Sequence, residues 1–365
     1  MSRRTSSHAN YSSSSRRGTR VASHIHDLPI ELVQQVFLFA CTDGGLMGCS
    51  LSRVSRSFRT AAHPVRYHSI ALTGLGQIAS FTAHYQHVLA AAARSSNPGA
   101  YPKVQHLYAM SHKEMLRRKV FEHDDDDDDD LDLAFSALAL DPRPASASTL
   151  APLPALLQLV APDVVTLCLA TVYTHTTLFA GCGPFRALRQ LTVARMQGVD
   201  VPPARARPLP TPLFPALEEL HIAMGVLDHS FEHLFCHWTE LAPRTAALRL
   251  SDVPWRVGAS CMCETFGERP RNYDPVFPSL RVLFVQPFPS PPPGRAEAPA
   301  LSAQRRELMH AITDLGRHPR RGTAVRVLQQ NNDCGAQHSV DLRRGWLEGV
   351  AGRSGFWAGG VDARM

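Results

Sequence analysis

The sequence has no long hydrophobic run. None of its 365 residues belongs to an uninterrupted apolar stretch near the ~18–20 residues that a membrane helix requires. The N-terminal end has no apolar segment of the kind found in secretory signals. We therefore expect no membrane partner and a location in the cytoplasm, the nucleus or both. The eight cysteines show no framework spacing, so they are expected to be reduced.

Charge is also scarce and unevenly placed. Charged residues make up 19% of the chain, and the formal net charge is +6. Residues 1–23 are rich in serine and arginine and contain no acid, whereas residues 124–130 are seven consecutive aspartates. Neither segment has the composition of a folded surface. The basic balance therefore does not indicate a nucleic-acid partner. Residues 1–23 contain too few apolar residues to bury a core, so they are predicted to be a disordered tail. Their composition is similar to that of a mitochondrial transit peptide, but they lack the apolar face that such a peptide needs.

Catalytic motifs are missing as well. The chain contains neither a His-Glu-x-x-His helix nor a Gly-x-Ser-x-Gly turn. Gly74 and Gly76 lie between a predicted strand and a predicted helix, as in a dinucleotide-binding turn, but no acidic residue for the ribose follows about 20 positions later. We interpret these glycines as a simple turn. The sequence therefore predicts no enzyme and no cofactor.

Metal sites have equally weak support. Cys261 and Cys263, with Cys236 and His237 upstream, offer zinc-ligand types, but a Cys-x-Cys pair is tighter than structural zinc sites use. Both cysteines are predicted to be loop or edge residues. The run of aspartates is interpreted as a solvated spacer, because adjacent like charges repel and extend the chain. No metal is expected.

Apolar residues near the start of the chain fall on helical stripes. Residues 28–40 carry one stripe, with Pro29 in the first turn, and a second stripe over residues 51–62 ends before Pro64. The glycine-rich segment 41–48 between them is predicted to be a loop. A short strand is expected within residues 67–72 and a helix over residues 75–93.

A pattern then recurs along the chain. An aromatic or apolar residue is followed at intervals of about three by further apolar residues, ending in an alternating Leu-x-Leu. The copies are centred on the following residues: Tyr101, Val104 and Leu107; Ala161, Val164, Leu167 and Leu169; Phe185, Leu188, Leu191 and Val193; Phe214, Leu217, Leu220 and Ile222; Leu248 and Leu250; Phe277, Leu280, Leu283 and Val285; Val325 and Val327. Helices are expected between copies, over residues 150–160, 229–241 and 301–315. Residues 112–149 and 287–299 are predicted to be disordered insertions.

Each copy is too small to bury its apolar face alone, so neighbouring copies are expected to stack. The predicted fold class is α/β: an N-terminal helical unit at residues 24–70, then an irregular solenoid of leucine-rich copies with a parallel sheet at residues 71–340. A C-terminal helix or tail is expected at residues 341–365. The alternative is that the repeats are unrelated strands of an ordinary α/β sheet.

Two segments carry a resemblance to a known family. Residues 26–37, HDLPIELVQQVF, resemble the opening helix of an F-box, and residues 51–59, LSRVSRSFR, resemble its later helix. The continuation AHPVRYHSI at residues 62–70 is similar to F-box proteins of mushroom-forming fungi, which also carry loosely spaced leucine-rich repeats. Phe58 stands where the family more often has Trp, and segment 41–48 is longer than usual.

The resemblance implies a substrate-recognition subunit of a Skp–cullin–F-box ubiquitin ligase. The F-box would bind the Skp adaptor, and the repeats would hold a protein substrate. The adaptor-binding residues implied by motif position are Leu28, Pro29, Leu32, Val36, Leu51, Val54 and Phe58. Some of these must instead pack the motif's own helices, and the sequence does not separate the two groups. The alternative function is a repeat scaffold that binds proteins without joining a ligase.

A substrate would be held on the concave face of the solenoid. Side chains that flank the inward leucines are expected on that face: Gln190, Thr192, Glu219, His221, Arg249, Ser251, Val282 and Phe284. Because arginine and aromatic residues dominate interface energies, Arg249 and Phe284 are the strongest candidates, followed by Glu219 and His221.

Overall fold

The protein is described from a computed structural model. The described residues are 25, 28–94, 101–111, 152–171, 178–179, 181–194, 211–224, 231–267, 276–288, 299–318, 322–328, 336–357 and 361–362. The predictions for the tail at residues 1–23, the insertion at residues 112–149 with its aspartate run, and most of the insertion at residues 287–299 lie outside this part of the chain.

One sheet organises the fold, and its strand order is the chain order. Strands β1 to β8 pair in parallel, and β9 pairs antiparallel with β8. The bounds are β1 Ser69–Leu72, β2 His106–Met110, β3 Thr166–Ala170, β4 Gln190–Ala194, β5 Glu219–Ala223, β6 Ala247–Val253, β7 Val282–Pro287, β8 Ala324–Val327 and β9 Val361–Asp362. The prediction of an α/β fold with a parallel sheet is confirmed. Every predicted copy of the sequence pattern supplies one of the strands.

Neighbouring strands are joined in the same way at their N-terminal ends. The carbonyl of His68 accepts hydrogen bonds from the amides of both Gln105 and His106, at 3.1 and 2.9 Å. The carbonyl of Gln105 then accepts from Val165 and Thr166 in the next strand. The arrangement recurs at the carbonyls of Val165, Arg189, Glu218 and Ala246. Because each carbonyl oxygen has two lone pairs, one residue before each strand fixes the register of the next, whatever the length of the connection.

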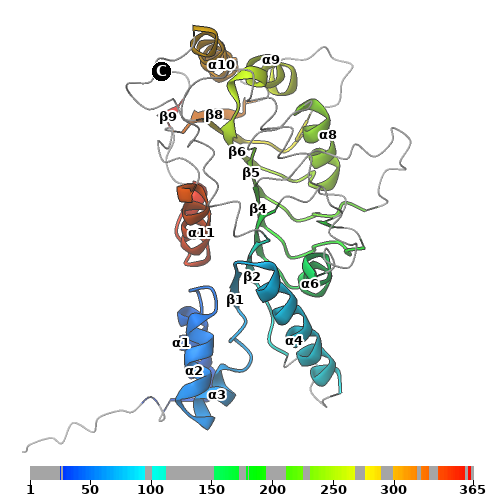
Figure 1. The fold of residues 1–365 in the computed structure, drawn as a ribbon, viewed down its shortest axis with the longest axis vertical. Coiled ribbons are helices and arrows are strands. Elements are labelled where there is room, and N and C mark those ends of the chain that lie inside the picture. The colour runs from blue at the N-terminus through cyan, green and yellow to red at the C-terminus, as the bar shows by residue number, and fades with distance from the viewer. Residues whose placement is uncertain are drawn as a thin grey trace, which may run out of the picture.

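One face of the sheet is covered by helices and forms the main core. The helices are α4 Leu75–Ala93, α6 Pro152–Val160, α8 Phe231–Leu241, α9 Trp255–Phe266 and α10 Pro299–Arg317, and they line one side of the sheet in Figure 1. The alternating apolar residues of the strands, such as Leu220 and Ile222, point into this core. Burial of one such side chain stabilises the fold by about 1.5–3 kcal/mol.

The aromatic residue of each copy fills the space between strand and helix. Phe185, Phe214 and Phe277 are buried, and Phe214 lies 6.0 Å from the Trp238 ring of α8 in a stacked arrangement. The amide of Phe277 also donates to Thr239 Oγ1 in α8, at 3.0 Å. These aromatic residues therefore lie between the sheet and the neighbouring helix.

The first three helices form a small unit with its own core. They are α1 Ile30–Ala40, α2 Leu46–Val54 and α3 Arg56–Ala62. Their buried residues are Val33, Phe37, Cys41, Leu51, Ala61 and Ala62. The unit is attached to the sheet through β1: the amide of Ala71 donates to the Gly44 carbonyl at 3.0 Å, and the buried Ser69 hydroxyl donates to the Cys41 carbonyl at 2.8 Å.

Three predictions for this unit need correction. Pro29 is the N-cap of α1 rather than a first-turn residue. The expected loop at residues 41–48 ends earlier, because α2 begins at Leu46. Gly48 lies inside α2, where a Cβ would be 2.3 Å from the Arg66 carbonyl oxygen, so this glycine allows a close backbone approach rather than a turn. The second stripe is two helices, since Ser55 is extended and its hydroxyl caps α3 by accepting from the Phe58 amide.

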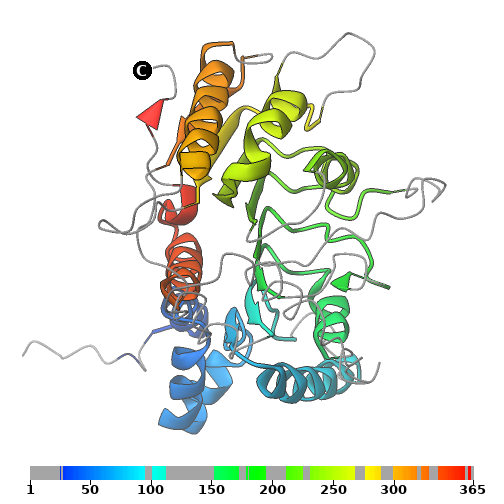
Figure 2. The ribbon, with the colours of Figure 1, turned by 45° about the horizontal axis from the view of Figure 1, so that its top comes forward.

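The opposite face of the sheet carries the C-terminal elements. Helix α11 Ala336–Val350 and the short 3-10 helix η4 Gly355–Trp357 lie on the side of the sheet away from α4, α6 and α8 (Figures 1 and 2). Helix α9 was not predicted. The expectation that Cys261 and Cys263 are loop or edge residues is wrong, because both belong to this helix.

Candidate functional site

The N-terminal unit exposes several large apolar side chains. Leu28, Leu32 and Val36 are 42%, 46% and 48% exposed, and Phe39 is 79% exposed. We call this set the N-terminal apolar surface; its members are Leu28, Ile30, Leu32, Val36, Phe39, Leu46, Met47 and Val54. Helix α1 is therefore apolar on two sides, since Val33 and Phe37 face the unit's own core. A helix that is apolar around most of its circumference is usually covered on more than one side.

The structure separates the seven residues that the F-box resemblance implied. Leu28, Pro29, Leu32, Val36 and Val54 are exposed. Leu51 is buried, and Phe58 packs partly buried against the same core, with its ring 5.2 Å from the ring of Phe37. These two residues hold the unit together. The sequence did not identify Ile30, Phe39, Leu46 and Met47 as members of this surface. Phe39 lies within the predicted stripe at residues 28–40, whereas Leu46 and Met47 lie in the segment that was predicted to be a loop.

Cys41 closes the unit's core beneath this surface. Burial, with the Asp43 carboxylate nearby, raises the pKa of the Cys41 thiol to about 11. The thiol therefore stays neutral near pH 7, and it serves as a small apolar group rather than as a nucleophile.

The second candidate site lies on the sheet face opposite the main core. The predicted substrate residues Glu219, His221, Arg249 and Phe284 are on neighbouring strands of this face, and His221, Arg249 and Phe284 are direct cross-strand partners. The sequence prediction thus places them on one face as expected. They are not at an open surface: His221 and Phe284 are buried, and Glu219 and Arg249 are partly buried.

A polar cluster occupies the centre of this site. Arg249 Nε donates to Ser251 Oγ at 3.1 Å, and an Arg249 Nη donates to Gln286 Oε1 at 2.9 Å. His221 Nε2 lies 2.9 Å from the same Ser251 hydroxyl. We call His221, Arg249, Ser251 and Gln286 the β5–β7 polar cluster. Burial lowers the pKa of the Arg249 guanidinium to about 10, and the Asp252 carboxylate acts in the opposite direction. The arginine remains charged near pH 7 in a partly dehydrated place.

Further along the same face, the sheet is apolar. Tyr108, Met110, Cys168, Ala170, Ala194 and Ala223 form a second buried cluster with Leu342 and Trp346 of α11. The Trp346 ring lies 5.7 Å from the ring of Tyr108. Burial raises the pKa of the Cys168 thiol, which keeps it neutral. Helix α11 is therefore held by apolar packing over β2 to β5.

No protein-family model matches this chain, and no curated protein does. The function is therefore inferred from the residues and their contacts.

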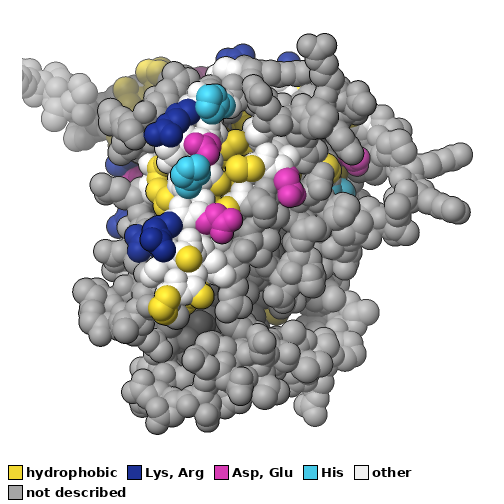
Figure 3. All heavy atoms as spheres, turned by 90° about the horizontal axis from the view of Figure 1, so that it is seen from above, with side chains coloured by type: hydrophobic (Ala, Val, Ile, Leu, Met, Phe, Trp, Pro, Cys, Tyr) yellow, Lys and Arg dark blue, Asp and Glu magenta, His cyan; other side chains and the backbone are white. Residues whose placement is uncertain are grey.

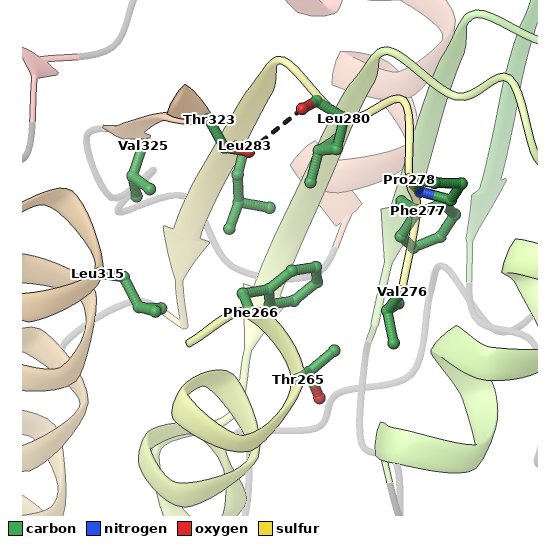
Figure 4. A pocket seen from close by; sticks show the side chains of 10 residues that line it. All are labelled: Thr265, Phe266, Val276, Phe277, Pro278, Leu280, Leu283, Leu315, Thr323 and Val325. Carbon is green, nitrogen blue, oxygen red and sulfur yellow. Dashed lines mark hydrogen bonds between the residues drawn. The ribbon is translucent and has the colours of Figure 1, made fainter. Parts of the chain in front are cut away.

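A cavity lies on the helix side of the sheet, between α9, α10 and β7. Its volume is about 30 Å³, and it is lined by Phe266, Leu283, Leu315 and Val325 among other apolar residues (Figure 4). Its polar lining includes Thr265 and Thr323, whose hydroxyl donates to the Leu280 carbonyl at 3.1 Å. None of the residues that line it is titratable, so it has no acid–base pair for catalysis.

The zinc-ligand candidates are not brought together as a metal centre. Among the described residues, no group of three or more His, Cys, Asp or Glu side chains gathers in a geometry that holds a metal ion. Cys236 on α8 and Cys263 on α9 are both exposed. Gly74 and Gly76 have open space where a Cβ would stand, so packing does not require glycine at either position.

The remaining surface seen in the figures is of mixed character. Figure 3 looks onto the end of the molecule that is uppermost in Figure 1, where basic, acidic, histidine and hydrophobic side chains of the described residues are interspersed. On α10, for example, Asp314 lies near both His310 and Arg317. Across the part of the chain that the structure describes, no helix is both long and apolar enough to cross a membrane.

Proposed function

We propose that this protein is a substrate-recognition subunit of a Skp–cullin–F-box ubiquitin ligase, with residues 24–70 as the F-box and the sheet domain as a leucine-rich-repeat solenoid. The observation that carries the proposal is the N-terminal apolar surface. A set of leucine, valine, isoleucine and phenylalanine side chains stands exposed on two short helices. Such patches mark protein–protein interaction sites.

The energetics favour a protein partner of substantial size. Because Leu32 and Val36 are 46% and 48% exposed, covering each completely would contribute about half of the roughly 1.5–3 kcal/mol that full burial gives. Several such residues together offset the association cost of roughly 4–15 kcal/mol. The exposed residues include most positions at which the F-box resemblance implies adaptor contacts, while Leu51 and Phe58 are already used inside the unit.

The repeat assignment rests on the regularity of the sheet. Sequential parallel strands, one shared carbonyl per junction and one buried aromatic or apolar plug per copy are what stacked repeats would produce. In this proposal the sheet domain presents a protein substrate, and the N-terminal unit brings it to the adaptor.

Co-purification with a Skp adaptor tests the proposal. The full chain with Leu32→Asp and Val36→Asp should lose adaptor binding by at least about 100-fold, since two apolar contacts are lost and two charges are buried. The matched control, Leu32→Met with Val36→Ile, keeps the surface apolar and should bind like the unmodified chain. Equal binding by the Asp variant would refute the proposed surface. No adaptor binding by the unmodified chain would favour a repeat scaffold that does not join a ligase.

A further inference from the structure

The C-terminal segment of the chain is seated on the predicted substrate face. The Phe356 ring lies 4.8 Å from the His221 ring, and the Arg249 guanidinium lies over the Phe356 ring at 5.8 Å. The other Arg249 Nη donates to the Phe356 carbonyl. The Trp357 ring lies 5.8 Å from the ring of Phe284, edge to face. Residues 355–357 therefore contact three of the four residues that the sequence nominated for substrate binding.

This segment has two parts with different chemistry. Helix α11 packs through Leu342 and Trp346 onto the apolar half of the face, over β2 to β5. The η4 tip instead covers the β5–β7 polar cluster through one aromatic ring and one backbone carbonyl. Removing α11 would expose the whole apolar cluster to water, whereas removing the tip would expose the polar cluster together with Phe284 and the edge of the apolar cluster that Phe356 covers. The tip can therefore leave at a much smaller cost than the helix.

The connection between α11 and the tip suits such a movement, although on the other side β9 stays paired with β8, so the tip would lift while both of its ends remain attached. Residues 351–354 are exposed, and Gly352 and Gly355 on either side of Arg353 and Ser354 have φ angles of +74° and +48°. Glycine adopts this region without strain. Beside the tip, between α11 and strands β3 and β4, there is a small hollow of about 20 Å³, lined in part by Thr192, Trp346 and Phe356.

Gly345 of α11 determines whether the η4 tip can pack against the helix. A Cβ at Gly345 would be 2.3 Å from the Phe356 ring, so only glycine accommodates the ring at this place. A Cβ at Gly349, one turn later on the same helix, would meet its nearest atom, Gln190 Oε1, at 3.6 Å, which is an ordinary contact. The two glycines lie one turn apart on α11, and only Gly345 faces the Phe356 ring, so they form a comparison pair for experiments.

The chemistry of the polar cluster indicates what the tip stands in for. The Arg249 guanidinium donates to Ser251, Gln286 and the Phe356 carbonyl, which are neutral, and the nearby Asp252 carboxylate also favours its charged form. A dehydrated guanidinium is better compensated by a carboxylate, which accepts shorter and stronger charge-assisted hydrogen bonds. The ring of Phe356, between His221 and Arg249, marks the place of an aromatic side chain directly before that acceptor.

We propose that the β5–β7 polar cluster is a peptide-binding site, that residues 355–357 occupy it as a removable internal ligand, and that the partner inserts an aromatic side chain followed by a carboxylate. The inference rests on the proposed function for the idea that the partner is a ligase substrate. The site itself does not depend on the adaptor, so its test leaves the adaptor out.

Release of the tip is tested first, by hydrogen exchange on the full chain. The amides of Arg353 and Trp357 donate to Glu348 and Ser354 carbonyls, at 2.9 and 2.8 Å. In Gly345→Ala these two amides should exchange at least about tenfold faster, while the amides of β5 to β7 stay protected. In Gly349→Ala they should exchange as in the unmodified chain. Unchanged exchange in Gly345→Ala, or equal acceleration in both variants, would overturn the removable tip. A full chain with Phe356→Ser and Trp357→Ser supplies a second released form if the first does not fold.

Binding is then measured with a labelled peptide, Gly-Arg-Ser-Gly-Phe, which copies residues 352–356 and ends in a free carboxylate. Its C-terminal amide is the matched control. Binding is measured in the chain with Phe356→Ser and Trp357→Ser, because this variant keeps Gly345 and leaves the place of the Phe356 ring open to the peptide's own ring. It should bind the carboxylate form about tenfold more tightly than the amide form, and about tenfold more tightly than the unmodified chain does. Adding Arg249→Gln should reduce carboxylate binding to the amide level.

Equal binding of the two peptides, or no binding by the variant with Phe356→Ser and Trp357→Ser, would overturn the proposed site. A chain that binds the carboxylate peptide but no Skp adaptor would keep this site and lose the ligase assignment. The reverse result would lose only the site.

Discussion

The sheet domain buries its apolar residues on both faces, whereas the N-terminal unit leaves several of its apolar residues exposed. The sheet has helices on one face and α11 on the other, so its strands are buried on both sides. The three N-terminal helices bury one side of α1 and leave Leu32, Val36 and Phe39 in water. The difference follows from size, because three short helices enclose too little volume to hide every apolar side chain. What a small unit leaves exposed therefore indicates where another molecule binds.

The largest effect is expected from removing an aromatic plug of the sheet domain. Phe214→Ala should lower the free energy of unfolding by about 3–5 kcal/mol, since Phe214 is fully buried against Phe185 and Trp238. Chemical denaturation measures the loss. Leu32→Ala, on the exposed surface of α1, is the comparison and should change the free energy by less than about 0.5 kcal/mol. Similar losses at the two positions would contradict the contrast drawn between the regions.

A second effect is expected inside the N-terminal unit. Gly48→Ala would place a Cβ 2.3 Å from the Arg66 carbonyl oxygen, so the backbone of α2 must move away from residues 63–67. We expect a loss of about 1–3 kcal/mol, as for other overpacked sites. Gly76→Ala is the control, because nothing lies within 4 Å of its Cβ position in α4. That change should be neutral or slightly stabilising. Hydrogen exchange will show whether the loss is confined to residues 30–62.

A third effect is a pH dependence located at the first strands of the sheet. Burial, with the neighbouring His68, lowers the pKa of His106 to about 3, and His106 Nδ1 lies 2.8 Å from Thr166 Oγ1. In the unfolded chain the pKa of histidine is about 6.5. The unfolded state therefore binds a proton first as the pH falls, and the native state is progressively destabilised below pH 6.5.

Between pH 7 and pH 5 this linkage lowers the free energy of unfolding by up to about 2 kcal/mol. Urea titrations at pH 7, 6 and 5 should show the decline in the unmodified chain and a shallower one in His106→Asn. Parallel declines in the two proteins would show that His106 is not the group responsible.

The double substitution on the N-terminal apolar surface should have the smallest effect on the free energy of unfolding and the largest effect on adaptor binding. Leu32→Asp with Val36→Asp should change the free energy of unfolding by less than about 1 kcal/mol, because both residues are nearly half exposed. The same variant is expected to lose adaptor binding. A large loss of stability would mean that these residues belong to the fold, and that the adaptor experiment has to be repeated with Val54→Asp, whose side chain is 64% exposed.

The strands were predictable because their signal is local. Alternation such as Leu220, His221 and Ile222 specifies a strand with two different faces, and the preceding Phe214 marks where each copy begins. Helix α9 was missed since its glycine, serine and cysteines favour a helix only weakly, although Met262 and Phe266 reach the core.

The position of α11 was not predicted, yet the sequence contains a signal for it. Ala170, Ala194 and Ala223 are direct cross-strand partners at the ends of β3, β4 and β5. A row of small side chains leaves room for a helix to lie against the sheet. The signal is visible only once the register is known, because these alanines are 24 and 29 positions apart in the chain. The separation of the seven implied adaptor residues into inner and outer sets likewise required the packing of Phe37 against Phe58.

Both borders of the sheet are closed by other parts of the chain. At one border the Gly44 carbonyl accepts from the Ala71 amide of β1, and at the other β9 runs antiparallel against β8. An uncovered parallel border would offer a template on which a second molecule adds its own strand. Because both borders are occupied, the proposed repeat array cannot be extended at either end. A duplicated repeat would therefore have to be inserted in the middle of the array. Variation in copy number among related chains should therefore appear between β2 and β7, with the two closing elements retained.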